Sequence, residues 1–228
     1  MVFGVILIGS VVAATGQVQA GPVAHAFSNY DGNETLTLRY SSGPMEIIST
    51  NGSEGWWSTT NGHNASITNY IVGDINGNGS NMYNDFFTFN VSSAIGKTLT
   101  GATLSVTQFG NNGDSTFTLF DVSTDAAMLN ATSGPNAAIF ADLCSGNSYG
   151  SFSENVGTSK KLGVYALNGQ SLIDINNASN AGRLFSIGGT LDPEMIALPE
   201  PSTIAAAMFG LITGATVLYR RRKVRMAA

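Results

Sequence analysis

Short runs rich in Thr, Val, Ile and Phe recur along most of this chain, and residues typical of turns separate them. Apolar and polar residues alternate cleanly over 102–107 and 117–122, as in strands with one buried face. Asn-Gly pairs, which favour hairpins and loops, recur between the runs. The pattern predicts an all-β fold, an antiparallel β-sandwich of jelly-roll type, with one short helix over 170–178. The candidate strands are 36–40, 45–49, 66–72, 85–91, 98–109, 115–122, 137–143, 148–154, 161–167 and 183–191.

The end of the chain has a different composition. Residues 203–219 carry no charge, and these 17 residues are the lower limit for a membrane-spanning helix. A basic cluster follows directly, and by the positive-inside rule it belongs in the cytoplasm. Two prolines precede the run and cannot continue a helix upstream, which leaves an extended segment at the outer membrane boundary. The basic cluster consists of Arg220, Arg221, Arg222, Lys223 and Arg225.

These three parts, in this order, closely resemble the PEP-CTERM sorting signal of exported bacterial proteins. The motif is Pro199-Glu200-Pro201, the transmembrane segment is 203–219, and the basic cluster lies within 220–225. The resemblance implies that an exosortase is the partner and handles the tail near the motif. It also implies transient anchoring in the inner membrane, followed by release to the cell surface or the extracellular matrix.

The start of the chain agrees with export. Residues 2–14 form an apolar run, and Ala20 or Ala26 ends an acceptable small-residue cleavage site. No Lys or Arg precedes Arg39, so a retained N-terminal anchor is the alternative. We therefore expect a signal peptide over 1–20, with cleavage at 26 as the variant. The predicted ectodomain is 27–191, a short stalk spans 192–198, and the sorting signal covers 199–225.

A second resemblance covers roughly residues 55–191. The segments 69–73, 85–90, 119–124, 138–143 and 185–189 look like a body domain that recurs among PEP-CTERM proteins. That resemblance implies a β fold at the cell surface and carries no assigned activity.

Charge and cysteine content limit the partners of the ectodomain. Five basic residues stand against 14 acidic ones before residue 198, a formal charge of −9. Nucleic acid is excluded as a partner, because phosphate binding needs a basic patch. The single Cys144 cannot form an internal disulfide. An acidic surface rich in Asn, Ser, Thr and Gly suits divalent cations and neutral glycans better.

One loop fits the first half of a calcium-binding pattern. Alternating oxygen ligands followed by a glycine, with a carboxylate at the twelfth position, could surround a Ca²⁺ ion. Asp85 is one methylene shorter than the usual Glu, and strands rather than helices flank the loop. A polar Asn-Gly loop without metal is the alternative. The candidate ligands are Asp74, Asn76, Asn78, Ser80 and Asp85.

Trp56 and Trp57 lie in a loop-rich region, where an exposed indole face could stack on a sugar ring. In a strand the two rings would point to opposite sides, so at most one would belong to the core. Packing in the core or at an edge is the alternative to this glycan platform.

Catalytic motifs give little support for an enzyme. The chain has two histidines and none of the common hydrolase or nucleotide-binding motifs. We expect a surface or matrix protein associated with exopolysaccharide or biofilm, and no enzyme. The alternative is a glycan-binding module, with calcium as a candidate cofactor. A secreted hydrolase is the third hypothesis.

Overall fold

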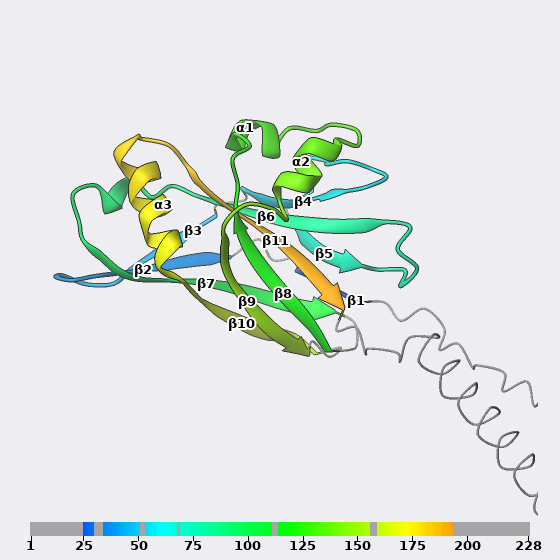
Figure 1. Cartoon of the computed structure of the whole chain (residues 1–228), viewed down its shortest axis with the longest axis horizontal. Coiled ribbons are helices and arrows are strands. Elements are labelled where there is room, and N and C mark those ends of the chain that lie inside the picture. The colour runs from blue at the N-terminus through cyan, green and yellow to red at the C-terminus, as the bar shows by residue number, and fades with distance from the viewer. Residues whose placement is uncertain are drawn as a thin grey trace, which may run out of the picture. The chain divides into compact units, whose positions relative to one another are not determined.

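The structure of this protein is a computed structural model that describes residues 25–29, 34–50, 53–67, 69–110, 114–155 and 159–193. The described chain is mostly antiparallel β-structure with a few short helices (Figure 1). In chain order the elements are β1 (His25–Asn29), β2 (Thr35–Tyr40), β3 (Glu46–Ser49), β4 (Glu54–Ser58), β5 (Tyr70–Asp74), β6 (Met82–Phe89), η1 (Ser92–Ala94), β7 (Leu99–Gly110), β8 (Asp114–Asp121), α1 (Ala126–Leu129), α2 (Ala137–Asp142), β9 (Ser148–Asn155), β10 (Lys161–Leu167), α3 (Gly169–Asn180) and β11 (Phe185–Pro193).

The strands form two antiparallel sheets. The smaller sheet has the order β3-β2-β7-β10. The larger sheet runs β1-β5-β6-β11-β8-β9, and β4 pairs with β6. The two sheets are joined where β1 pairs with both β5 and the end of β7. This arrangement confirms the predicted all-β sandwich.

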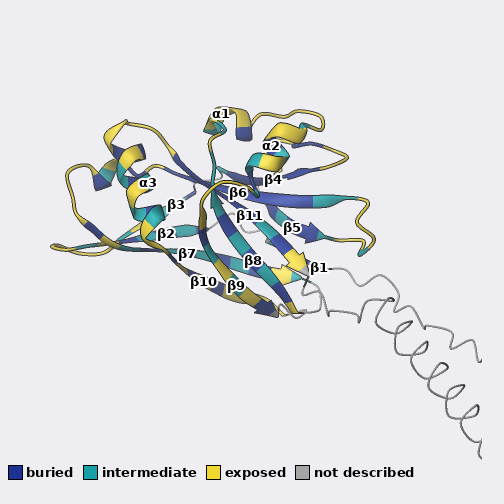
Figure 2. Ribbon diagram, viewed as in Figure 1, coloured by how far each residue is buried: buried dark blue, intermediate teal, exposed yellow. Residues whose placement is uncertain are grey.

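The main core lies between the sheets. Along β7, alternate residues from Ala102 to Gln108 are buried, as the period of two predicts for a strand with one face inward. Leu104 stands between Leu36 of β2 and Tyr165 of β10 in the register of the smaller sheet. Figure 2 shows this alternation of buried and less buried segments along the strands. The 12-residue helix α3 places Ile175 and Ala178 in the same core.

A second, smaller core covers the outer face of the larger sheet. Trp57 of β4 and Phe86 of β6 pack there against Leu129 of α1 and Ile139 of α2. A Cβ atom added at Gly188 of β11 would lie 2.5 Å from the carbonyl oxygen of Leu143, just after α2. The close approach of backbone at this point therefore needs a glycine.

Most predicted elements occur near their expected positions, whereas one predicted strand is a helix, and β1, β4 and α1 were not predicted. The segment 137–143 was predicted as a strand, but residues 137–142 form helix α2. The loop-rich region around the two tryptophans contains strand β4. The short helix predicted over 170–178 is confirmed within α3, where the Asn168 side chain accepts hydrogen bonds from the first free backbone N–H groups.

The chain divides into two units, Met1–Pro193 and Glu194–Ala228. The predicted signal peptide 1–20, the sorting motif, the transmembrane segment 203–219 and the basic cluster all lie outside the described residues, whereas the variant cleavage position at 26 lies within β1. Among the residues that are described, no helix is long and apolar enough to cross a membrane. Strand β11 continues two residues past 191, to Pro193.

Candidate functional site

The prediction that Trp57 stacks on a sugar is wrong. Its side chain is 0% exposed, and its indole Nε1 donates a hydrogen bond to the carbonyl oxygen of Leu129 at 3.1 Å. The ring of His63 stacks on it with ring centroids 5.6 Å apart. Trp57 therefore fixes α1 to the sheet and has no free face for a ligand.

Trp56 points to the opposite face of β4 and is partly buried. Its ring makes an edge contact with Tyr83, with centroids 5.2 Å apart. Its Nε1 is buried without a hydrogen-bond partner. Stacking of Trp56 on a glycan stays a prediction.

The calcium loop is held by its own hydrogen bonds. The carboxylate of Asp74 accepts the backbone N–H groups of Asn76 and Gly79. The amide oxygen of Asn78 accepts from the backbone N–H of Ser80 at 3.0 Å and from its hydroxyl at 2.5 Å. Within the described ranges there is no group of three or more His, Cys, Asp or Glu side chains placed to hold a metal ion.

Asp85, the predicted twelfth ligand, belongs to the core instead of the loop. It lies within β6, paired with Trp56 of β4 on one side and Gly189 of β11 on the other. Its side chain is 0% exposed and lies on the same face of β6 as Phe87 and Phe89, which belong to the main core. The prediction that Asp85 closes the calcium loop is therefore wrong.

Without Asp85 as a candidate ligand, calcium binding by the loop stays a prediction that rests on one carboxylate, Asp74. At about 5 mM calcium and a Kd of about 10⁻³ M, binding would stabilise the protein by about 1 kcal/mol. We expect the melting temperature to rise by about 2–4 °C, and Asp74→Asn to abolish the rise. Asp192→Asn, an exposed carboxylate outside the loop, is the matched control. An unchanged melting temperature in calcium would contradict the prediction.

Asp85 is one of four carboxyl groups buried among the described residues, and the others are Glu34, Glu54 and Glu154. Glu34 is 1% exposed and Glu54 is 2% exposed. Burial raises the pKa of Asp85 well above its usual value, and the charge of Glu34 adds to the rise. Burial also raises the pKa of Glu54 to about 7, again with a contribution from Glu34. Neither oxygen of Asp85 has a hydrogen-bond partner, so this group stays protonated well above its usual range.

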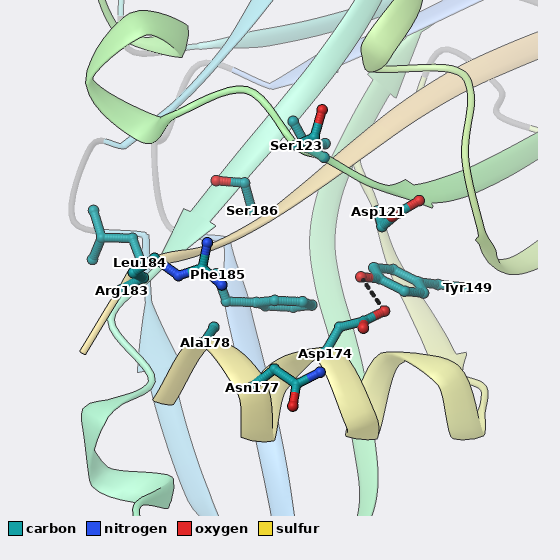
Figure 3. A pocket seen from close by; sticks show the side chains of 11 residues that line it. Asp121, Ser123, Tyr149, Asp174, Asn177, Ala178, Arg183, Leu184, Phe185 and Ser186 are labelled. Atoms are coloured by element: carbon teal, nitrogen blue, oxygen red, sulfur yellow. Dashed lines mark hydrogen bonds between the residues drawn. The ribbon is translucent and has the colours of Figure 1, made fainter. Parts of the chain in front are cut away.

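A pocket of about 250 Å³ opens between α3, the start of β11, the end of β8 and the start of β9 (Figure 3). We call it the α3 pocket. Phe185, Tyr149 and Ala178 are buried residues in its wall, and the rings of Phe185 and Tyr149 are 5.8 Å apart. The polar residues that line it are Asp121, Ser123, Asp174, Asn177, Arg183 and Ser186.

Hydrogen bonds fix the two carboxylates of the α3 pocket. Asp174 accepts from the Tyr149 hydroxyl at 3.1 Å and from the Gln170 amide at 3.2 Å. Asp121 accepts from the backbone N–H of Asn147. Burial raises the pKa of Tyr149, and the charge of Asp174 raises it further, so Tyr149 keeps its proton and remains a donor. The α3 pocket therefore offers preset acceptor oxygens.

Sequence reasoning missed the α3 pocket. Asp121 ends β8, whereas Asp174 and Asn177 lie on α3 and Arg183 lies between α3 and β11. The only available signal was the predicted helix over 170–178, which places Asp174 and Asn177 three residues apart and so on one helix face. Comparisons of the chain with protein-family models, with curated proteins and with solved structures found no match.

Proposed function

We propose that this chain is an exported bacterial surface or extracellular-matrix protein whose C-terminal tail is recognised and processed by an exosortase. The supporting observation is the order of the tail: Pro199-Glu200-Pro201, the uncharged segment 203–219 and the basic cluster within 220–225. In this proposal the segment spans the inner membrane with the basic cluster in the cytoplasm. A jelly-roll body and a C-terminal spanning helix are its structural parts.

The structured body ends close to the proposed processing site. Strand β11 ends at Pro193, and only residues 194–198 separate it from Pro199. A sandwich on so short a connection would stay near the membrane until the tail is cut. The chain has no catalytic activity in this proposal. It also has no nucleic-acid partner, in line with the excess of acidic residues before residue 198.

Mass spectrometry of the protein from the cell surface tests the processing step. We expect the surface form to lack residues 220–225, because cleavage near the motif leaves them attached to the membrane segment on its cytoplasmic side. Replacing Pro199 and Pro201 by alanine should retain the full-length form in the inner membrane. Met195→Ala, a change in the connection outside the motif, is the control. A surface form that still carries residues 220–225 would make the segment a permanent anchor.

Polysaccharide binding is the second candidate function, and the α3 pocket is the observation that favours it. Hydroxyl groups of sugars both donate and accept hydrogen bonds. The α3 pocket offers carboxylate acceptors together with the donor groups of Asn177 and Arg183. Binding of the host's own exopolysaccharide to the purified protein tests this candidate. Saturable binding would support it, and no binding would leave a structural matrix protein.

A further inference from the structure

The polar groups of the α3 pocket are separated by charge. Figure 3 shows Asp121 and Asp174 on one side, Arg183 on the other, and the ring of Phe185 between them. Among the described residues Arg183 makes no ion pair at or below 4.0 Å, and both Arg183 and Asn177 are exposed. Two carboxylates and one guanidinium give the pocket a formal charge of −1.

This charge pattern selects among ligands. A net negative pocket disfavours phosphate and uronic acids, because like charges brought together lower affinity. A cationic group of the ligand would be attracted to the side that holds Asp121 and Asp174. Hydroxyl groups would then face Asn177 and Arg183, which donate hydrogen bonds. A ligand with one cationic group and several hydroxyls complements both sides.

The size of the pocket limits the ligand to a small unit. Its volume of about 250 Å³ is below the range of about 300–1,000 Å³ found for drug-sized ligands. The aliphatic edge of a single sugar ring could lie over the partly apolar wall formed by Phe185 and Ala178. The pocket therefore suits one residue of a polysaccharide better than an extended chain.

We propose that the α3 pocket binds one amino-sugar residue of a polysaccharide, with its ammonium group at Asp121 and Asp174. This inference rests on polysaccharide binding, the second candidate function, and names the class of sugar. The ammonium group supplies up to three donors to acceptor-only carboxylates. Arg183 and Asn177 bind the hydroxyl groups on the opposite side.

The experiment measures binding of the full-length protein in detergent to an immobilised glucosamine oligomer at about 0.15 M salt, where interactions between distant surface charges are weakened. The fully N-acetylated oligomer and an oligogalacturonate serve as comparison probes. We expect the glucosamine oligomer to bind most tightly. Free glucosamine should compete, whereas ammonium chloride at the same concentration should not.

Isosteric variants locate the site. Asp121→Asn and Asp174→Asn should each weaken binding about tenfold to a hundredfold, the effect of losing a hydrogen bond between charged groups. Asp192→Asn removes the same charge from the exposed end of β11, outside the pocket, and should bind like the parent. Arg183→Ala and Asn177→Ala change only exposed side chains, so they test the pocket even if the aspartate variants fold poorly.

The outcomes separate the two proposals. Equal weakening by Asp192→Asn and Asp121→Asn would assign binding to general surface charge and overturn the inference. Tighter binding of the N-acetylated or acidic probe would also overturn it. If the host's exopolysaccharide binds equally to the parent and to the pocket variants, polysaccharide binding stands and the pocket is not its site. Failure of every polysaccharide to bind would overturn both.

Discussion

At pH 8, Asp85→Asn is expected to melt above the parent protein, and this gap should shrink as the pH falls toward 4. The carboxyl group of Asp85 is fully buried and neither of its oxygens has a hydrogen-bond partner. Its pKa is raised well above the usual value by burial. Asparagine has nearly the same shape and never ionises, so it removes the cost of a buried acid without changing the packing volume.

The direction of this pH dependence follows from proton binding. In the unfolded chain Asp85 loses its proton at a pKa of about 3.9, whereas the folded protein keeps it bound to a much higher pH. Between the two pKa values the folded state holds more protons, so stability falls as the pH rises. Each pH unit over which only the folded state holds this proton costs about 1.4 kcal/mol of stability.

Glu54→Gln provides a matched control, because Glu54 differs from Asp85 in the pH at which its destabilising effect stops growing. Burial raises the pKa of Glu54 to about 7. The Glu54→Gln variant should therefore gain stability over the parent between about pH 4.3 and pH 7, and the gain should stay constant above pH 7. Thermal unfolding of the parent and of both variants, followed by circular dichroism from pH 4 to pH 9, measures the two differences in melting temperature. A gap between each variant and the parent that does not grow as the pH rises from 4 would contradict the raised pKa of that carboxyl group.

Local sequence patterns predicted an element correctly where one of its faces is buried and the other is exposed to solvent. Residues 161–167 were predicted as a strand and form β10, because Gly163, Tyr165 and Leu167 point inward while their neighbours are exposed. Helix α3 was found from its own signals, and Asn168 caps it by accepting hydrogen bonds from Gln170 and Ser171. In these cases the local pattern and the tertiary environment agree.

Patterns failed where burial comes from elements distant in sequence. Residues 137–142 have the composition of a short apolar strand, and short apolar runs do not distinguish strand from helix. Here Asn136 caps a helix by accepting from Ala138 and Ile139, and Ile139 packs on the outer face of the larger sheet. The local sequence contained the cap, but the sheet face that the helix covers is assembled from β4 and β6.

For the candidate sites, too, sequence patterns failed where the position of a side chain depends on elements distant in sequence. Spacing alone placed Asp85 in a calcium loop, although β6 carries it into the main core three residues after the strand begins. Asp121 and Asp174 share the α3 pocket although they lie far apart in the sequence. A pattern read along the chain detects neighbours in sequence, and this pocket is formed by the packing of α3 against the end of the sandwich.

Trp57→Ala is expected to lower the free energy of unfolding by about 3–5 kcal/mol, which is about 6–20 °C in melting temperature. The change removes the largest side chain of the smaller core, leaves the carbonyl oxygen of Leu129 without its donor, and exposes His63. Trp57→Phe should cost less than alanine, since it keeps most of the apolar contact and loses only the hydrogen bond, worth about 1–3 kcal/mol when a buried partner is left unsatisfied.

Trp56→Ala is the matched control for this effect, because it removes the same kind of side chain from the opposite face of the same strand. Trp56 is only partly buried, so its loss should lower the melting temperature much less. Neither tryptophan lines the α3 pocket, and variants that remain folded should bind the glucosamine oligomer as the parent does. Equal destabilisation by the two alanine variants would show that Trp57 does not hold α1 and α2 to the sheet. Loss of binding in folded Trp56→Ala would instead restore Trp56 as the glycan platform.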